Sequence, residues 1–285
     1  MKFNIIKSPR VLSLIFFFLS MNFGFSEVFP LIDSENSAVN LQKKYAADLN
    51  LPIEWVNKSG IVFRLIPAGR YKLGDVSSAL FREVVITKPY YLGKFEVSRK
   101  EYEKITNKKN SDYYPGENKP INYIRWHDTR FFLKKLNALE GTKRGKGYRL
   151  PTEAEWEAAA RGGVQPGEGI GDNKTFWTTE NSLSQIKDVG LSSSNAYGLF
   201  DMLGNIWEWC FDIYNKNSYN FDSLHDPKGA KNSLYGYRVI RGGSVCHNIS
   251  SASYGLRSFY QGGRSERWIG FRIAILAENV QVGKE

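Results

Sequence analysis

Apolar side chains after the first 26 residues recur with a helical rather than an alternating period. In SAVNLQKKYAADLNL, residues 37–51, they fall at Val39, Leu41, Tyr45 and Leu49. Intervals of four residues place side chains on one face of a helix. We therefore predict a helical lead-in over residues 27–50, a main domain over 51–278 and a tail over 279–285.

The main domain opens with short extended segments. GIVFRLIPAGRYKLGD, residues 60–75, holds two β-rich pieces around a Pro-Ala-Gly turn. REVVITKPYYLGKFEVS, residues 82–98, holds another pair. Runs of β-branched and aromatic residues bounded by Gly and Pro are typical of short strands.

Helix-capping signals follow the strands. Ser98 with Glu101 three residues later has the spacing of a capping box, in which each side chain bonds the other's backbone N–H. WHDTRFFLKKLNALEG, residues 126–141, carries an apolar stripe, and we predict Asp128 as its N-cap and Gly141 as its end.

PTEAEWEAAARGG, residues 151–163, predicts a further helix. Thr152 is the expected cap, Glu155 closes the box and the final glycine pair ends the helix. Its glutamates could also suggest acid–base catalysis, but capping and packing explain them better, because acidic groups are favoured at a helix N-terminus.

Short strands and long Gly/Ser/Asn-rich loops make up the chain from residue 164 to about 276. Helices and strands do not alternate, so a doubly wound parallel sheet is excluded. We predict an α+β fold with two main helices on short, twisted, largely antiparallel strands. Long loops of this kind often carry function.

The first 26 residues have a basic start followed by the apolar run VLSLIFFFLS and small residues at Gly24 and Ser26. That run is shorter than the ~20 residues of a membrane-spanning helix, so we predict a secretory signal peptide over residues 1–26, with an uncleaved anchor as the alternative. Cleavage removes three of the positive charges and lowers the net charge from +10 to +7. A basic surface attracts anionic partners, or it simply keeps the protein soluble. We expect no nucleic-acid partner, because no arginine–aromatic motif accompanies the charge.

Seven motifs together resemble the sulfatase-modifying factor family, whose founder is the formylglycine-generating enzyme. They run in family order from about Leu51 to Ala274: FRLIPAGRYKLGD, KFEVSRKEYEKI, KPINYIRWHDT, YRLPTEAEWEAAARGG, NAYGLFDMLGNIWEW, RVIRGGS and GFRIA. The resemblance implies a formylglycine-generating-enzyme-like variant of the C-type lectin fold, rich in loops.

DMLGNIWEW resembles a calcium-binding stretch of the family. The resemblance implies as ligands the side chains of Asp201 and Glu208 and the backbone carbonyls of Gly204 and Ile206. Calcium prefers such hard oxygen donors, two of them anionic. The alternative is an Asn/Gly turn with a solvent-facing glutamate.

Catalytic relatives hold copper between two thiolates in the loop that follows RVIRGGS. The resemblance would give Ser244 and Cys246 catalytic roles if this chain were an enzyme. However, Ser250, Ser251 and Ala252 occupy the region of the second thiol. Two soft thiolates stabilise Cu(I) and one does not, so copper is not expected.

Cys246 has two further candidate partners. His247 follows it directly, but neighbours on an extended chain point to opposite faces and do not readily chelate one metal. A free thiol is vulnerable outside the cell. We therefore predict a disulfide between Cys210 and Cys246, which would stabilise the fold by roughly 3–4 kcal/mol.

Aromatic and arginine side chains on a Gly/Ser-rich background fill the last loop, which is typical of a recognition surface. We predict ligand contacts at Tyr254, Phe259 and Tyr260, whereas Arg257 and Trp268 read better as scaffold. Non-catalytic relatives, including variable proteins, look like this.

Three functions follow from these observations. The first is a secreted or periplasmic, non-catalytic protein that binds a protein or a glycan through its C-terminal loops. The second is an oxidoreductase of the formylglycine-generating type that acts on a protein cysteine. The third is a component of an envelope assembly. The sequence does not indicate an oligomeric state.

Overall fold

The computed structural model describes residues 29–75, 80–109, 115–170, 176–216, 224–233 and 235–280. The expected signal peptide lies outside these residues. No helix within them is both long and apolar enough to cross a membrane.

Helices occupy mainly the first two thirds of the chain. They are α3 (Glu35–Leu49), α4 (Arg99–Thr106), α5 (Trp126–Glu140), α6 (Glu153–Arg161) and α7 (Thr179–Ser182), with the 3-10 turns η2 (Ile249–Ser251) and η3 (Ala277–Asn279). Helix α3 packs beside β2, where Gln42 Nε2 donates to the Leu65 carbonyl at 2.7 Å.

Ten short strands form three sheets within the described residues. They are β1 (Glu54–Val56), β2 (Val62–Ile66), β3 (Gly69–Asp75), β4 (Leu80–Ile86), β5 (Tyr90–Gly93), β6 (Trp207–Ile213), β7 (Tyr237–Arg241), β8 (Arg257–Gln261), β9 (Ile269–Gly270) and β10 (Ala274–Leu276). The sheet orders are β1-β2-β5-β10, β3-β4 and β8-β7-β6-β9, and every pair but β6-β9 is antiparallel. The predicted α+β class with largely antiparallel strands is confirmed.

Capping decides where the helices begin. Ser98 and Thr152 cap α4 and α6 through the predicted boxes, and Gly141 ends α5 in the left-handed region at φ 68°. Asp128, however, is not the N-cap of α5. The helix begins at Trp126, with Arg125 as the cap and Asp128 accepting its backbone N–H at 3.1 Å.

Burial of Trp126 explains this earlier start. Its side chain is buried, and its indole Nε1 donates to the Cys210 carbonyl at 2.9 Å. Apolar burial and a satisfied indole N–H stabilise the additional residues of the first turn.

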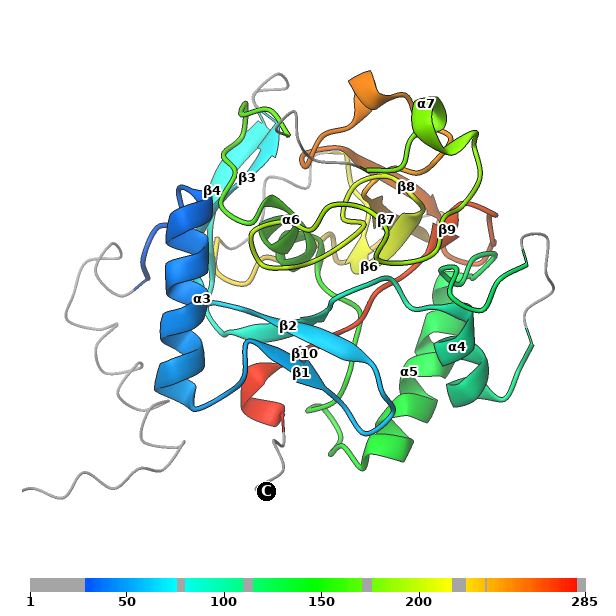
Figure 1. Ribbon diagram of the computed structural model, residues 1–285, viewed down its shortest axis with the longest axis horizontal. Coiled ribbons are helices and arrows are strands. Elements are labelled where there is room, and N and C mark those ends of the chain that lie inside the picture. Colours follow the sequence, from blue (N-terminus) through cyan, green and yellow to red (C-terminus); the bar gives the residue numbers. More distant parts are fainter. Residues whose placement is uncertain are drawn as a thin grey trace, which may run out of the picture.

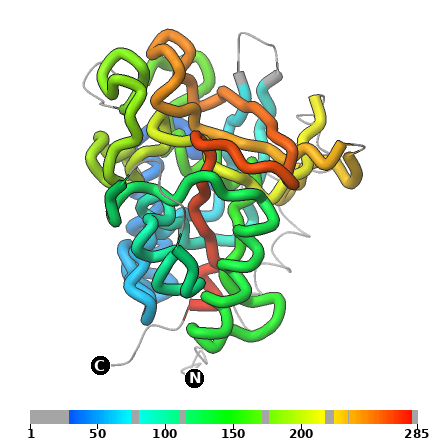
Figure 2. The backbone as a smooth tube through the Cα atoms, turned by 90° about the vertical axis from the view of Figure 1, so that its right-hand side faces the viewer, coloured from blue at the N-terminus to red at the C-terminus, as the bar shows by residue number. Residues whose placement is uncertain are grey.

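Helix α6 lies between the β3–β4 hairpin and the β6–β7–β8 sheet, as Figure 1 shows. Its residues from Glu153 to Arg161 are all buried. The loops from α7 to β9 gather at the end of the molecule opposite the tip of α5 (Figure 2). In this arrangement the C-terminal segments pack against α6.

Candidate functional site

Strand β7 leads directly into the turn that carries Cys246. Gly242 and Gly243 adopt φ values of 96° and 80°, which favour glycine. A Cβ on Gly242 would lie 3.2 Å from the Trp156 ring. The turn therefore passes close over α6 and delivers Ser244 to a buried position.

Ser244, Cys246 and His247 form one hydrogen-bonded corner. Ser244 Oγ lies 3.0 Å from His247 Nδ1 and accepts the Cys246 backbone N–H at 3.3 Å. The His247 ring packs edge-on against Trp207 at 5.1 Å, and burial lowers the pKa of its imidazole. A neutral imidazole beside a hydroxyl is a polar anchor for the turn.

Both cysteines are free thiols, so the predicted disulfide is wrong. Cys210 lies on the face of β6 that packs into the core with Ala154, Trp156 and Val239, where it is fully buried. Cys246 is exposed in the turn beyond β7. Because strand alternation points the Cys210 side chain into the core, its sulfur does not approach the sulfur of Cys246 at the surface.

The surroundings of both thiols favour the protonated form. Burial raises the pKa of the Cys210 thiol well above its ordinary value, and partial burial also raises that of Cys246 although Arg267 opposes it. Thiolate, not thiol, is the metal ligand and the nucleophile. With two cysteines in the whole sequence, the chain has no pair of surface thiolates for copper.

Helix α7 holds the other side of the Cys246 turn. The Thr179 N–H donates to the His247 carbonyl at 3.0 Å, and the Ile249 N–H donates to the Glu180 carboxylate at 3.0 Å. The residues after α7, Leu183 and Ser184, have φ values of 55° and 54°, and the Leu183 side chain is 82% exposed. The exposed side chain of Leu183 thus lies on the segment next to the turn.

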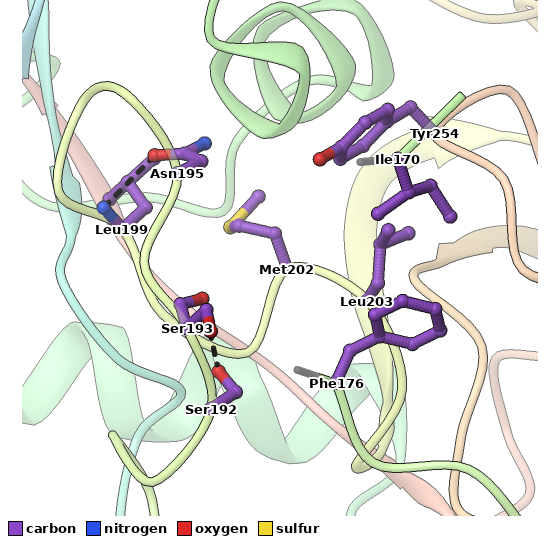
Figure 3. Close-up of a pocket in the computed structure, with 9 residues that line it drawn as sticks. All are labelled: Ile170, Phe176, Ser192, Ser193, Asn195, Leu199, Met202, Leu203 and Tyr254. Carbon is purple, nitrogen blue, oxygen red and sulfur yellow. Dashed lines mark hydrogen bonds between the residues drawn. The ribbon is translucent and has the colours of Figure 1, made fainter. Parts of the chain in front are cut away.

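The predicted ligand contacts divide between the core and the surface. Tyr254 is buried, only 5% exposed, and lines a small cavity with Ile170, Phe176, Met202 and Leu203 (Figure 3). Its role as a direct ligand contact is therefore not supported, because the ring already packs against the core. Phe259 is 41% exposed, whereas Tyr260 is half-buried with its ring 6.3 Å from that of Trp209.

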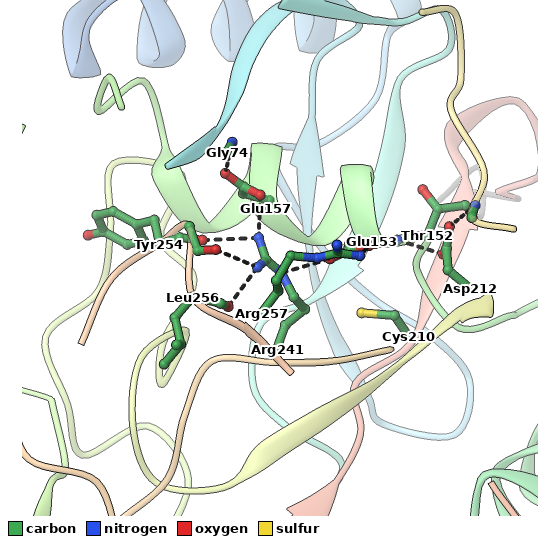
Figure 4. A network of polar contacts seen from close by, with 12 residues as sticks. Gly74, Thr152, Glu153, Glu157, Cys210, Asp212, Arg241, Tyr254, Leu256 and Arg257 are labelled. Carbon is green, nitrogen blue, oxygen red and sulfur yellow. Dashed lines mark hydrogen bonds and ion pairs between the residues drawn. The ribbon is translucent and has the colours of Figure 1, made fainter. Parts of the chain in front are cut away.

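A buried ion network fixes the C-terminal loop to α6 (Figure 4). Arg241 pairs with Glu157, and its Nη1 donates to the carbonyls of Gly255 at 3.0 Å and Leu256 at 2.6 Å. Arg257 is bidentate to Glu153, with both distances 2.8 Å. The glutamates of α6 are thus structural, and Arg257 is scaffold, as predicted.

Asp212 joins this network from β6. Its Oδ2 accepts the Glu153 backbone N–H at 2.7 Å at the start of α6. Burial, with the neighbouring Glu153 carboxylate, raises the pKa of Asp212 to about 7. Sequence reasoning missed the parts played by Arg241 and Asp212, because their partners lie 84 and 59 residues away.

The residues expected to bind calcium fit that ion only in part. Glu208 is fully buried, and its carboxylate oxygens accept from Arg272 Nε and Nη2, both at 2.6 Å, and from the Trp156 indole at 2.7 Å. Glu208 is therefore not solvent-facing, and its oxygens already accept hydrogen bonds instead of being free to coordinate calcium. Asp201 keeps a buried oxygen, Oδ1, that has no hydrogen-bond partner.

A carboxylate that sequence reasoning missed lies in the same cluster. Glu96 is buried, its Oε1 also has no partner, and its Oε2 accepts from Asn205 Nδ2 at 3.2 Å. Burial and then the nearby Asp201 carboxylate raise the pKa of Glu96 well above its ordinary value. The described residues contain no group of three or more His, Cys, Asp or Glu placed to hold a metal. Calcium binding stays a prediction.

Comparison with known proteins adds family and fold to this geometry. Residues 58–277 match the family model described as sulfatase-modifying factor enzyme 1-like domain. The chain is 32% identical over 184 residues to a formylglycine-generating enzyme of Streptomyces coelicolor, an alignment that covers 58% of this chain and 55% of that enzyme. The match thus spans little more than half the length of that curated relative.

Two solved structures share the architecture. Treponema denticola variable protein 1 superposes with a TM-score of 0.70 at 23% identity, covering 79% of this chain and 99% of that one. PvdO from Pseudomonas aeruginosa does so with a TM-score of 0.68 at 22% identity, covering 78% and 97%. The predicted formylglycine-generating-enzyme-like variant of the C-type lectin fold is confirmed.

Proposed function

The chain belongs to the sulfatase-modifying factor enzyme 1-like domain family, and from that premise we propose that it is a non-catalytic member that binds a protein or a glycan through its C-terminal loops. The observation that carries this proposal is the separation of its two thiols, one in the core and one at the surface. A single protonated thiol supplies neither the paired ligands of Cu(I) nor a nucleophile.

The surroundings of Cys246 also support recognition. Leu183 and Ile249 are exposed apolar side chains on the two segments that meet at the turn, and Phe259 is exposed on β8. Bonds from α7 hold the turn that carries Ile249, and Arg241 holds the loop that leads into β8. Ordered loops lose less conformational entropy on binding.

Copper chemistry separates this proposal from the oxidoreductase alternative. The mature protein, incubated with Cu(I) under reducing anaerobic conditions and desalted, is expected to retain far less than one equivalent of copper. A sulfatase-type peptide containing cysteine is expected to keep its thiol when oxygen is then admitted, as mass spectrometry would read. Stoichiometric copper together with an aldehyde product would overturn the non-catalytic proposal, and Cys246→Ser would then locate the chemistry.

The proposal places the protein outside the cytoplasm, either secreted or periplasmic. Support comes from the basic start and the apolar run of the first 26 residues. Mass measurement of the protein from culture medium and periplasmic extract tests this location. A product that keeps residues 1–26 in the cytoplasmic fraction contradicts it.

Calcium is proposed as a structural ion near Asp201, with Glu96 rather than Glu208 as the second anionic side chain. Both have a buried oxygen without a partner, which a cation would satisfy. Calcium at about 100 times its Kd should stabilise the fold by ~2.7 kcal/mol, as thermal unfolding would show. Asp201→Asn should abolish that gain, and magnesium is the control ion. An equal gain in wild type and variant rejects the site.

A further inference from the structure

Four aromatic side chains gather at one end of β7 and β8, and we call them the aromatic shelf: Tyr214, Tyr235, Tyr237 and Phe259. The ring of Phe259 lies 4.3 Å from that of Tyr214 and 4.8 Å from that of Tyr237. The Tyr235 ring continues the row, 5.7 Å from Tyr237. The rings therefore form one continuous surface.

The aromatic shelf is open to solvent beyond the start of α6. Phe259 lies opposite Val239 in the strand register, and Val239 packs into the core with α6. Helix α6 does not extend over the aromatic shelf, so Phe259 is 41% exposed and Tyr235 is 67% exposed. Contiguous exposed apolar surface marks an interaction site in a folded protein.

Polar contacts beneath the aromatic shelf fix its shape. The Arg257 guanidinium lies 5.0 Å from the Tyr214 ring while it pairs with Glu153 on α6. Its Nη1 donates to the Asn215 carbonyl at 3.2 Å, and the Tyr214 N–H donates to the Tyr237 carbonyl at 3.1 Å. The rings are thus held in place before any ligand binds.

Positive charge surrounds the aromatic shelf. Described residues 211–216, 224–233, 235–241 and 255–264 contain seven Lys and Arg and two acids, Asp212 and Asp226. Arg241 and Arg257 are paired with Glu157 and Glu153 of α6, so five cations remain beside the two acids. Both acids accept backbone N–H groups, Asp212 from Glu153 and Asp226 from Thr87 at 2.8 Å. Lys216, two residues after Tyr214, and Lys228 are exposed. The local field therefore favours an anionic ligand.

We infer that the aromatic shelf binds an acidic polysaccharide, an assignment that rests on the binding role proposed above and narrows it to one ligand class. The electron-rich faces of Phe259 and Tyr237 attract the C–H groups that a sugar ring presents on its flat side. Lys216 and Lys228 attract the carboxylates or sulfates along the chain. A continuous row of rings suits a linear polymer, and the tilt between neighbouring rings presents both faces and edges to it.

Calorimetric titration of the mature protein tests the inference with three polymers: oligogalacturonate, sulfated dextran and neutral dextran of matched length. Both acidic polymers, or one of them, should bind at least about tenfold more tightly than neutral dextran, a difference of ~1.4 kcal/mol. Comparison of oligogalacturonate with sulfated dextran distinguishes recognition of carboxylates from recognition of sulfates. Raising the salt concentration should weaken binding, because exposed charges are screened.

Two variants locate the site. Phe259→Ala should weaken binding roughly tenfold or more, since aromatic anchors carry much of the binding energy of an interface. Lys216→Ala combined with Lys228→Ala should weaken binding about threefold at low salt and flatten the salt dependence. Circular dichroism and thermal unfolding confirm that each variant is folded.

Matched controls exclude general effects of the substitutions. Phe211→Ala removes a similarly exposed phenylalanine, 47% exposed, from β6 and outside the aromatic shelf. Lys43→Ala combined with Lys134→Ala removes the same charge from exposed positions on α3 and α5. Both controls should bind as the wild type does.

Several results would overturn the inference. They are absence of binding to both acidic polymers, equal binding of neutral dextran, unchanged affinity of Phe259→Ala, and tighter binding of a single-stranded oligonucleotide. A defined protein ligand whose binding depends on Leu183 or Ile249 would also overturn it, while leaving the proposed binding function intact. Aldehyde formation in the copper experiment would instead overturn that function.

Discussion

Replacing Arg272 with methionine should lower the free energy of unfolding by about 3–5 kcal/mol, the cost of stranding a buried charge. Arg272 is fully buried, and it donates to both oxygens of Glu208, to the Gly93 carbonyl and to the Phe200 carbonyl. Its loss leaves the negative charge of Glu208 without a partner cation, close to the buried carboxyl groups of Glu96 and Asp201. Urea unfolding followed by tryptophan fluorescence measures the effect.

A matched control for Arg272 is a cation at the surface. Lys94→Met removes a pair with Glu54 whose side chains are 23% and 41% exposed, so it should cost less than about 1 kcal/mol. Adding Glu208→Gln to Arg272→Met should restore part of the lost stability, since it removes the unpaired charge. An Arg272→Met protein as stable as the Lys94→Met control would refute this view of the cluster.

Replacing Arg241 with methionine should cost about 3 kcal/mol and loosen the loop that leads into β8. Arg241 is fully buried, pairs with Glu157, and donates hydrogen bonds to the carbonyls of residues 254–256. Without it those carbonyls lose this donor, and Glu157 loses one buried cation while it keeps Arg161 and the Gly74 N–H. Urea unfolding measures the stability, and hydrogen exchange by mass spectrometry measures the loop.

Hydrogen exchange in the loop over residues 252–258 distinguishes Arg241 from a residue that affects only the overall stability. Peptides covering 252–258 should exchange faster in Arg241→Met than in Arg64→Met, which removes a partly exposed pair with Glu54. Exchange should remain unchanged in α5, which lies outside the network. Equal exchange of 252–258 in the two variants would show that Arg241 does not hold the loop.

Local sequence predicted the features that depend on neighbouring residues. Ser98 and Thr152 were identified as caps because their bonds to Glu101 and Glu155 span only three residues. The α+β class followed from the order of periodic segments. Burial of Trp126 overrode the same reasoning at Asp128, because the indole finds its partner on Cys210, 84 residues away.

The candidate ligand contacts were predicted from residue type, and the sequence did not predict which of them are exposed. Tyr254, Phe259 and Tyr260 have the same aromatic character, yet the structure buries the first, exposes the second and half-buries the third. Successive strand residues face opposite sides, and α6 covers one side only in part. Tyr214 and Tyr237, whose half-buried rings lie beside Phe259, carried no signal of their own.

The sequence by itself determined the family, the class of fold, the helix caps and the number of thiols, since motifs, periodicity and counting need no third dimension. Only the tertiary structure decided which thiol is buried, which carboxylates lack partners and which rings face solvent. Those properties depend on contacts between residues such as Glu96 and Asn205, 109 positions apart. Such contacts are made when strands and helices pack, and the pattern along the chain does not specify them.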